Sequence, residues 1–426
     1  MNKIRTALRA LAKKNTALRK IMRGVMYACR RICYILRGLG TEVSPETVVF
    51  EAYNGKSYAC SPKAVYEYML EDKRFTNYIF VWIFKEPEKY AFLQKNRNTY
   101  LVKYRSSECE RVLNVAKYWI FNYRALDHWV PKKEQVYVQC WHGTPLKRLG
   151  YDIENSDNAM NSQSEIRAKY RKDAERFRYL LSPCRFATER FVSAWNLREW
   201  GREDAILEVG YPRNDFLVNH SKEDVQRIRE VLGLSDEKRG VILYAPTWRD
   251  NQHDSSIGYT YESKVDFDYL RRELGGEYII LFRAHYLVAN SFDFSEYEGF
   301  VYDVSEVDDI NELYVISDML VTDYSSVFFD YAILEKPIIF YMYDLEEYRD
   351  EVRGFYLGLD ELPGTVVTDE EGLVREIRNV EITERKIVGE EIIRLPGKCK
   401  EFNMRFNNLN DGRASERFVR GVITGV

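Results

Sequence analysis

The sequence lacks the patterns that mark several common classes of protein. Its seven cysteines are scattered and form no CxxC pair, which argues against a zinc site or a disulfide framework and is typical of a chain kept in a reducing cytosol. It contains neither a Walker loop nor a GxGxxG pattern. No apolar run is long enough to span a bilayer, and no secretory signal is recognisable. Nothing in the sequence requires a metal or a cofactor.

Acidic residues are absent before Glu42, whereas the same stretch holds eleven Lys and Arg. Apolar residues recur there at helical spacing, from Leu8 to Leu36, which predicts a basic amphipathic helical arm over residues 1–38. Such a helix suits an anionic membrane surface, where each Lys or Arg contributes about 1 kcal/mol. The alternatives are a helix that packs on the body of the protein and a contact with nucleic acid. We favour the membrane surface and expect no nucleic-acid partner.

Length and composition favour two globular α/β domains. The chain has 426 residues, 45% of them hydrophobic and 30% charged, as in an ordinary folded protein. From about residue 45, apolar strands alternate with helical stretches, which predicts a parallel sheet with helices on both faces. A second series of this kind begins after residues 210–217. Strands are expected at residues 48–51, 78–84, 100–104, 118–122, 136–140, 178–182 and 206–209, and then at 241–244, 278–283, 300–303, 319–321 and 337–341.

This alternation predicts four segments in the chain. They are an arm over residues 1–40, a first Rossmann-like domain over 41–215, a second over 216–400, and a C-terminal helical segment over 401–426 that can return to the first half. Two doubly wound halves of similar size imply a cleft between them, and a ligand would bind in that cleft.

The stretch EQVYVQCWHGTPLKRLGY, residues 134–151, carries the most informative strand end. A strand from Val136 to Cys140 stops at Trp141 and His142, where open α/β sheets bind ligands. Histidine is the side chain best suited to move a proton near neutral pH. The glycine and proline that follow allow close backbone approach and fix the turn. The alternative is a strand, a turn and a packed histidine.

Four other strand ends carry polar clusters: GYPRND at residues 210–215, YAPTWRD at 244–250, RAH at 283–285 and VTDYSS at 321–326. The last leads into a helix, whose amino terminus offers free N–H groups to a phosphate. Simple capping of that helix by Asp323 or Ser325 is the common alternative.

Arg283 and His285 lie two residues apart, so an extended strand would point both side chains to the same side. Together they can neutralise a pyrophosphate. Only five histidines are present, and two of them end apolar strands, which favours a functional interpretation of His142 and His285.

These motifs, in this order, resemble those of the CDP-glycerol glycerophosphotransferases of teichoic acid synthesis. The opening stretch FEAYNGKSYACSPKAVYEYM is also similar to that family, and the resemblance covers roughly residues 45–360. It implies an α/β fold of the GT-B type, with two Rossmann-like doubly wound domains and an active site in the interdomain cleft. It also implies transfer of glycerol phosphate or ribitol phosphate from a CDP-linked donor, with release of CMP.

The resemblance assigns roles to individual residues. His142 would take the proton from the acceptor hydroxyl, and His285 would act with Arg283 on the pyrophosphate. Ser325 and Ser326 would bind phosphate. The residues implied in substrate binding are Trp141, Gly143, Thr144, Pro145, Arg213, Pro246, Thr247, Arg283, Ser325, Ser326 and Asp330, the last at the cytidine end of the donor.

We therefore expect an enzyme whose partners are CDP-glycerol or CDP-ribitol and a lipid-linked saccharide or growing polyol-phosphate acceptor. The arm would hold it peripherally at the cytoplasmic face of the cell membrane. Two other classes stay open. A GT-B glycosyltransferase would use a sugar nucleotide, and a non-catalytic membrane-associated scaffold would give no product with any donor.

Overall fold

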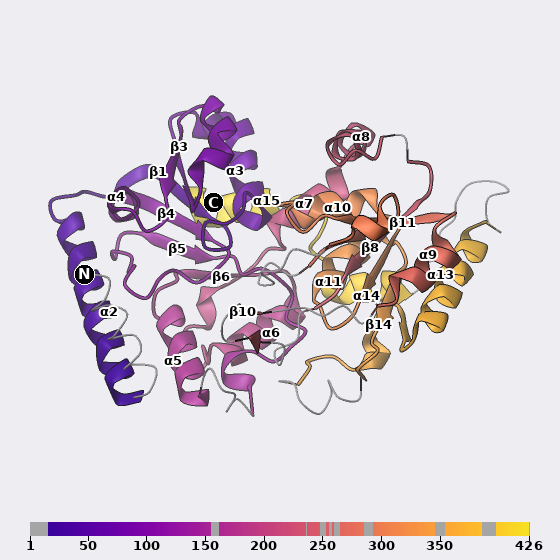
Figure 1. Ribbon diagram of the computed structural model, residues 1–426. Helices are drawn as coiled ribbons and strands as arrows, with labels where there is room; N and C mark the ends of the chain where they lie inside the picture. Colours follow the sequence, from indigo (N-terminus) through magenta and orange to yellow (C-terminus); the bar gives the residue numbers. More distant parts are fainter. Residues whose placement is uncertain are drawn as a thin grey trace, which may run out of the picture. The chain divides into compact units, whose positions relative to one another are not determined.

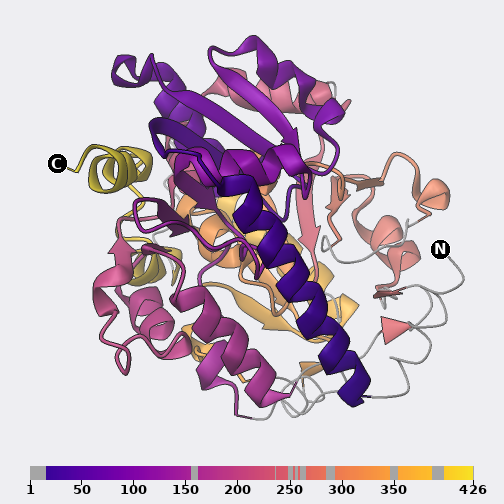
Figure 2. The same cartoon turned by 90° about the vertical axis from the view of Figure 1, so that its left-hand side faces the viewer.

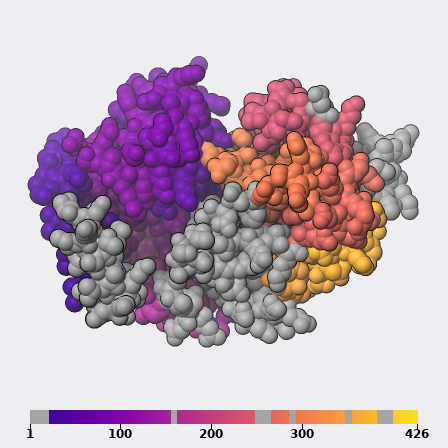
Figure 3. All heavy atoms as spheres, in the orientation of Figure 1, coloured from indigo at the N-terminus to yellow at the C-terminus, as the bar shows by residue number. Residues whose placement is uncertain are grey.

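The computed structural model describes residues 16–154, 162–235, 237–247, 253–254, 258–259, 265–284, 293–345, 354–385 and 398–425 (Figure 1). Figure 3 shows the same chain as filled atoms, with all other residues in grey. Contacts divide the chain into two compact units. The first unit comprises residues 1–57, 66–141 and 172–180, and the second comprises residues 58–65, 142–171 and 181–426.

The first sheet has seven strands in the order β3-β2-β1-β4-β5-β6-β7, and the neighbouring pairs from β3 to β6 are parallel. Its order reverses between β1 and β4. The strands are β1 (Ser44–Glu51), β2 (Ile79–Phe84), β3 (Thr99–Lys103), β4 (Ala116–Phe121), β5 (Val136–Gln139), β6 (Tyr179–Ser182) and β7 (Ile206–Glu208). The helices of this part are α3 (Cys60–Glu71), α4 (Ser107–Val115), α5 (Gln163–Ala174) and α6 (Arg185–Ala194).

The second sheet has six parallel strands in the order β12-β11-β8-β13-β14-β15. The strand order changes sense between β8 and β13. The strands are β8 (Gly240–Ala245), β11 (Tyr278–Phe282), β12 (Val301–Asp303), β13 (Met319–Thr322), β14 (Ile338–Tyr341) and β15 (Thr365–Val367). The helices are α7 (Asp215–Asn219), α8 (Lys222–Val231), α9 (Phe267–Leu274), α10 (Ile310–Ile316), α11 (Val327–Tyr331), α13 (Glu370–Arg385), α14 (Lys398–Phe406) and α15 (Ala414–Val419).

Local sequence explains why these elements form where they do. The central strands are apolar on both faces, as parallel strands covered by helices must be, and Val48, Val49 and Phe50 are fully buried. Several helices begin at a side-chain cap. Ser106 accepts a hydrogen bond from the backbone N–H of Cys109, and Ser221 forms a reciprocal capping box with Asp224.

The twelve predicted strands are all present, within one to four residues at each end, so the prediction of parallel α/β sheets is confirmed. The sequence reasoning missed β15 and the short hairpin of β9 (His253–Asp254) and β10 (Gly258–Tyr259). The boundary at residues 215 and 216 stays a prediction. The first sheet ends at Glu208 and the second begins at Gly240.

Helix α2 (Thr16–Gly38) forms the described part of the arm (Figure 2). It packs on α4 within the first unit. Tyr34 is buried and its carbonyl accepts a hydrogen bond from Asn114, while Arg37 pairs with Glu110. Residues 1–15 of the predicted arm lie outside the described residues.

The C-terminal helices contact Asp215 and helix α6, which both precede the second sheet in the chain. Asp215 caps α15 by accepting hydrogen bonds from the backbone N–H groups of Ala414 and Ser415, at 2.8 and 2.7 Å. Phe406 of α14 packs edge-to-face on Phe186 of α6. These contacts all lie within the second unit.

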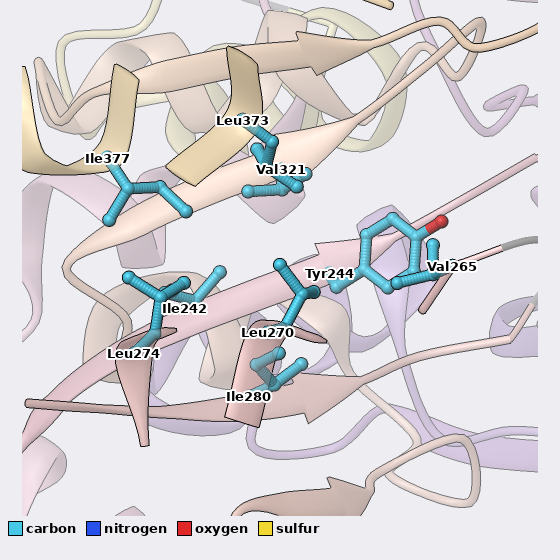
Figure 4. A pocket seen from close by; sticks show the side chains of 9 residues that line it. All are labelled: Ile242, Tyr244, Val265, Leu270, Leu274, Ile280, Val321, Leu373 and Ile377. Carbon is cyan, nitrogen blue, oxygen red and sulfur yellow. The ribbon is translucent and has the colours of Figure 1, made fainter. Parts of the chain in front are cut away.

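The core of the second sheet contains one small apolar void. Helices α9 and α13 cover this face, and Figure 1 shows α10 and α11 on the other side of the strands. The void measures about 10 Å³, and its lining residues are Ile242, Tyr244, Val265, Leu270, Leu274, Ile280, Val321, Leu373 and Ile377 (Figure 4). A site of this size with apolar walls has no room for a ligand. It is a packing imperfection of the core.

Candidate functional site

The strand end that carries His142 has an unusual backbone. Trp141 follows β5 with a φ of 53°, a left-handed conformation that is uncommon outside glycine. Its backbone N–H donates to the side chain of Gln139 at 2.9 Å, and the Arg124 guanidinium lies 5.7 Å from its ring centroid. This turn ends the strand abruptly. It leaves His142 half-buried at the start of the following loop.

The loop that begins with His142 is clamped by residues 354–356 of the same unit. Lys147 and Phe355 form an antiparallel bridge. The N–H of Arg148 donates to Gly354 at 3.0 Å, and the N–H of Tyr356 donates to Leu146 at 2.8 Å. The Tyr356 hydroxyl in turn accepts from the N–H of Leu149 at 3.1 Å. The loop is therefore held by backbone pairing on a segment some 200 residues away.

Gly143 brings this loop against the start of α11. A Cβ atom at position 143 would lie 2.8 Å from the Ser326 hydroxyl oxygen, closer than such atoms approach. Phe355 also stacks on Tyr324, at 5.9 Å between ring centroids. The second unit thus unites the His142 loop with the predicted phosphate-binding serines. Thr144 and Pro145 are buried beside them.

A Gly143→Ala variant is expected to lose tenfold to a hundredfold in kcat/KM, because its methyl group displaces either Ser326 or the loop, and about 1 Å of misplacement costs up to about a hundredfold. If the chain releases CMP, as the motif resemblance implies, steady-state kinetics of that release would measure the loss, and thermal unfolding would report the strain. In the double variant Gly143→Ala/Ser326→Ala the hydroxyl is gone, so the unfolding temperature should return toward that of Ser326→Ala alone. If the unfolding temperature and kcat/KM of Gly143→Ala both equal those of the parent, Gly143 does not lie this close to Ser326.

The ends of β8 and β13 meet at the reversal point of the second sheet. The Asp323 carboxylate accepts hydrogen bonds from the N–H groups of Thr247 and Tyr324, at 2.8 and 2.6 Å. Asp323 therefore joins two strand ends. Ser326, the residue just before α11, makes no side-chain capping bond. Carboxyl ends of parallel strands at such a reversal are where open α/β sheets bind ligands. Pro246 and Thr247 lie at this point and are buried.

Arg283 directly follows β11, the strand beside β8. Its guanidinium donates to the carbonyls of Val304 and Val307, at 3.1 and 2.7 Å, and the side chain is half-buried. These bonds fix the arginine at the carboxyl edge of the sheet. His285, its predicted companion, lies outside the described residues, as do residues 248–250 of the YAPTWRD motif.

Arg213 and Asp330 form a buried ion pair, with the closest approach at 2.8 Å and side chains only 5% and 9% exposed. Asn214 also donates to Asp330 at 2.9 Å, and the Arg213 guanidinium stacks on Tyr211 at 4.1 Å. The sequence suggested these two residues separately as donor contacts. Their pairing ties the GYPRND turn to α11.

The sequence reasoning found no candidate residue before Trp141. The structure gathers polar side chains at the carboxyl ends of four first-unit strands: Glu51 at the end of β1, Lys85 after β2, Tyr104 after β3 and Asn122 after β4. The signal was available, since each of these residues ends or directly follows a strand that the sequence predicts.

No helix among the described residues is long and apolar enough to cross a membrane. Within the same ranges, no group of three or more His, Cys, Asp or Glu side chains is placed to hold a metal ion.

Comparison with known proteins identifies the family. The family model described as CDP-Glycerol:Poly(glycerophosphate) glycerophosphotransferase matches residues 34–424. The chain belongs to this family. The match confirms the resemblance read from the motifs and extends it almost to both ends of the chain.

Individual relatives agree with the family match. The chain is 39% identical over 419 residues to the teichoic acid poly(glycerol phosphate) polymerase of Staphylococcus epidermidis, covering 98% of this chain and 54% of that protein. It is 37% identical over 379 residues to the teichoic acid glycerol-phosphate transferase of Staphylococcus aureus, covering 88% and 92%. It spans about half the length of the first curated family members that it matches.

A solved structure supports the fold. The wall teichoic acid polymerase TagF superimposes with a TM-score of 0.80 at 38% identity, covering 100% of this chain and 97% of that chain. One TagF structure is of a variant soaked with CDPG.

Proposed function

We propose that this chain transfers glycerol phosphate, or ribitol phosphate, from a CDP-linked donor to a hydroxyl of a lipid-linked saccharide or growing polyol-phosphate chain. The observation that carries the proposal is the family match over residues 34–424, together with His142, Gly143 and Ser326 gathered in one unit. The reaction releases CMP and serves the synthesis of teichoic acid or a related cell-surface polymer. The two α/β units would be the halves of a GT-B type fold.

In the proposed reaction the acceptor oxygen attacks the β-phosphorus, which bears the polyol, in line with the bridging oxygen. The bond from the β-phosphorus to that bridging oxygen breaks, and CMP leaves with the electron pair. His142 takes the proton of the acceptor hydroxyl. The half-buried position of this imidazole, at the start of a loop held by backbone pairing, supports its role as a base with a fixed direction.

Negative charge that develops on the pyrophosphate is stabilised by hydrogen-bond donors that are already in position. Arg283 offers them, because its bonds to Val304 and Val307 hold the guanidinium at the carboxyl edge of the sheet. We assign Ser325 and Ser326 to the phosphates and Pro246 and Thr247 to the nucleotide. Arg213 and Asp330 are assigned, as a pair, to the cytidine end, and His285 to the pyrophosphate. Trp141, Thr144 and Pro145 would shape the site beside His142.

The test is CMP release from a panel of CDP-glycerol, CDP-ribitol and a UDP-sugar, each with a lipid-linked saccharide acceptor. Release from a CDP-polyol alone is the expected result. UDP release from the sugar nucleotide would instead make the chain a glycosyltransferase. If no nucleotide is released from any donor and calorimetry detects no donor binding, the chain is a non-catalytic scaffold.

The arm is proposed to hold the enzyme at an anionic membrane surface, at the cytoplasmic face. Four apolar residues at helical spacing are more than half exposed on α2: Ile21 at 63%, Val25 at 57%, Ile32 at 56% and Leu36 at 59%. The 4-7-4 spacing puts them on one side of the helix, whereas Tyr34 and Arg37, on another side, contact α4. An apolar face turned to solvent and flanked by basic residues fits insertion into the headgroup region.

Replacing the four residues of this stripe by serine is expected to lower partitioning onto phosphatidylglycerol vesicles at least about tenfold, because each apolar group buried in lipid contributes roughly 1 kcal/mol or more. Sedimentation with vesicles would measure it. The control is the same number of exposed apolar residues elsewhere, Val218, Val231, Leu359 and Met404 changed to serine. If both quadruple variants sediment like the parent, the arm does not bind the membrane.

A further inference from the structure

The carboxyl edge of the first sheet is polar over four adjacent strands. In the order β3-β2-β1-β4, the residues that end or follow these strands are Tyr104, Lys85, Glu51 and Asn122. The strand order changes sense between β1 and β4, and the carboxyl edge at such a point is where an open α/β sheet binds a ligand. Nothing in the proposed donor chemistry uses these residues.

The loop after β1 is held in a fixed, strained shape at this edge. Tyr53 and Asn54 have left-handed φ angles of 50° and 58°. Glu51 accepts from the N–H of Gly55 at 2.8 Å, Asn122 accepts from the N–H of Tyr53 at 2.8 Å, and the N–H of Lys85 donates to the Gly55 carbonyl at 2.6 Å. Three strand ends thus combine to hold one short loop.

Three cations gather above this loop, and we call Lys56, Lys85 and Arg105 the cationic cluster. All three side chains are exposed. Lys85 and Arg105 approach the ring of Tyr104, at 5.9 and 5.1 Å from its centroid. The pKa of Lys85 is lowered by partial burial and then by the positive charges of Lys56 and Arg105. Three like charges this close repel one another, and a bound anion would relieve that repulsion.

The carboxyl group beneath the cluster does little to neutralise it. Glu51 is 1% exposed, and burial raises its pKa to about 8, so at neutral pH it is largely uncharged. Its Oε1 accepts from Gly55, whereas its Oε2 is buried without a hydrogen-bond partner. A buried polar atom of this kind needs an explanation in the structure. A protonated Glu51 supports the loop without placing a full negative charge beside the cations.

We propose that the cationic cluster binds a phosphodiester of the acceptor chain, a polyol phosphate that has already been added. This inference rests on the proposed function. Lys and Arg on an exposed sheet edge recognise phosphate by charge-assisted hydrogen bonds. The cluster lies on the sheet whose β5 leads through Trp141 to His142, and β2 is three strands from β5, about 14 Å away at the usual strand spacing.

That separation decides which phosphate is bound. Atoms that react must come within about 3–3.5 Å of each other, so the β-phosphorus of the donor must be close to the acceptor hydroxyl that His142 activates. A phosphate about 14 Å along the sheet edge belongs to an earlier unit of the acceptor. The cluster therefore favours acceptors that already carry polyol phosphate over bare saccharides.

The experiment compares Lys85→Gln/Arg105→Gln with Lys73→Gln/Lys95→Gln. The second pair removes two exposed charges near the opposite, amino-terminal ends of β2 and β3. With an acceptor that carries several glycerol phosphates, the first variant should raise the acceptor KM about tenfold while kcat and the Kd for CDP-glycerol stay unchanged. With an acceptor that carries none, both variants should match the parent. A KM unchanged for the longer acceptor would overturn the proposal.

A second readout separates this proposal from the proposed function. Binding of soluble oligo(glycerol phosphate) is measured by calorimetry without donor, and it should weaken about tenfold in Lys85→Gln/Arg105→Gln only. This result is expected even if the reaction class is wrong. If instead the variant binds the oligomer normally but loses binding to phosphatidylglycerol vesicles, the cluster recognises lipid headgroups and the acceptor site is refuted.

Discussion

A His142→Ala variant is expected to lose on the order of a hundredfold or more in turnover while its affinity for CDP-glycerol is largely kept. In the proposed mechanism the imidazole removes the proton of the acceptor hydroxyl as the bond to phosphorus forms, and a positioned base contributes about a hundredfold to ten-thousandfold. It does not neutralise the donor, whose pyrophosphate is assigned to Arg283 and the serines before α11. CMP release with saturating acceptor gives kcat, and calorimetry gives the Kd for the donor.

The matched control is His220→Ala, since His220 is a half-buried histidine whose ring contacts the carbonyl of Leu217, at 3.0 Å, and the ring of Phe216, at 6.1 Å between centroids. It should turn over like the parent. Full activity of His142→Ala on the proper acceptor would refute the base assignment. A large loss of affinity for CDP-glycerol with an unchanged kcat would mean that His142 binds the donor and does not act in the chemical step.

An Asp330→Ala variant is expected to lower the free energy of unfolding by about 3–5 kcal/mol. The guanidinium of Arg213 would stay buried at 5% exposure without the carboxylate that it faces at 2.8 Å, and breaking one side of a buried pair leaves an uncompensated charge. Chemical denaturation followed by tryptophan fluorescence would measure the loss. An unchanged unfolding midpoint would contradict the buried pair.

The double variant Arg213→Met/Asp330→Leu separates stability from binding. Replacing both charges by apolar groups of similar volume removes the desolvation cost, so most of the stability should return. If the pair acts on the cytidine end of the donor, this stable variant still binds CDP-glycerol poorly. If it binds the donor like the parent, the pair is only structural, and the role that the motif resemblance suggested is wrong.

The strands could be predicted because each is a short apolar run bounded by turn residues, such as Val48–Glu51 before the YNG turn. Parallel pairing within each sheet follows from the two α/β series, but the order of the strands does not. The placement of the candidate residues beside strand ends followed equally well: His142, Thr247 and Arg283 each lie within three residues after a strand. The sequence reasoning missed strand β15, although β7 and β12, which also have three residues each, were predicted.

What the sequence could not give is which distant groups meet. Arg213 and Asp330 are 117 residues apart, and from the sequence each was predicted separately to contact the ligand. The clamp on the His142 loop comes from residues 354–356, a segment with no pattern of its own. Glu51 ends a predicted strand, yet its burial depends on the fold of Gly55 and Lys85 around it.

The most direct test of the central claim is a transfer assay with CDP-glycerol labelled with ³²P at the β-phosphorus and with ³H in the glycerol. Attack at the β-phosphorus predicts that the acceptor product carries both labels in the donor's ratio, while the released CMP carries neither. Tritium in the product with ³²P left on the nucleotide would mean that glycerol alone was transferred. That result would contradict the proposed phosphotransferase.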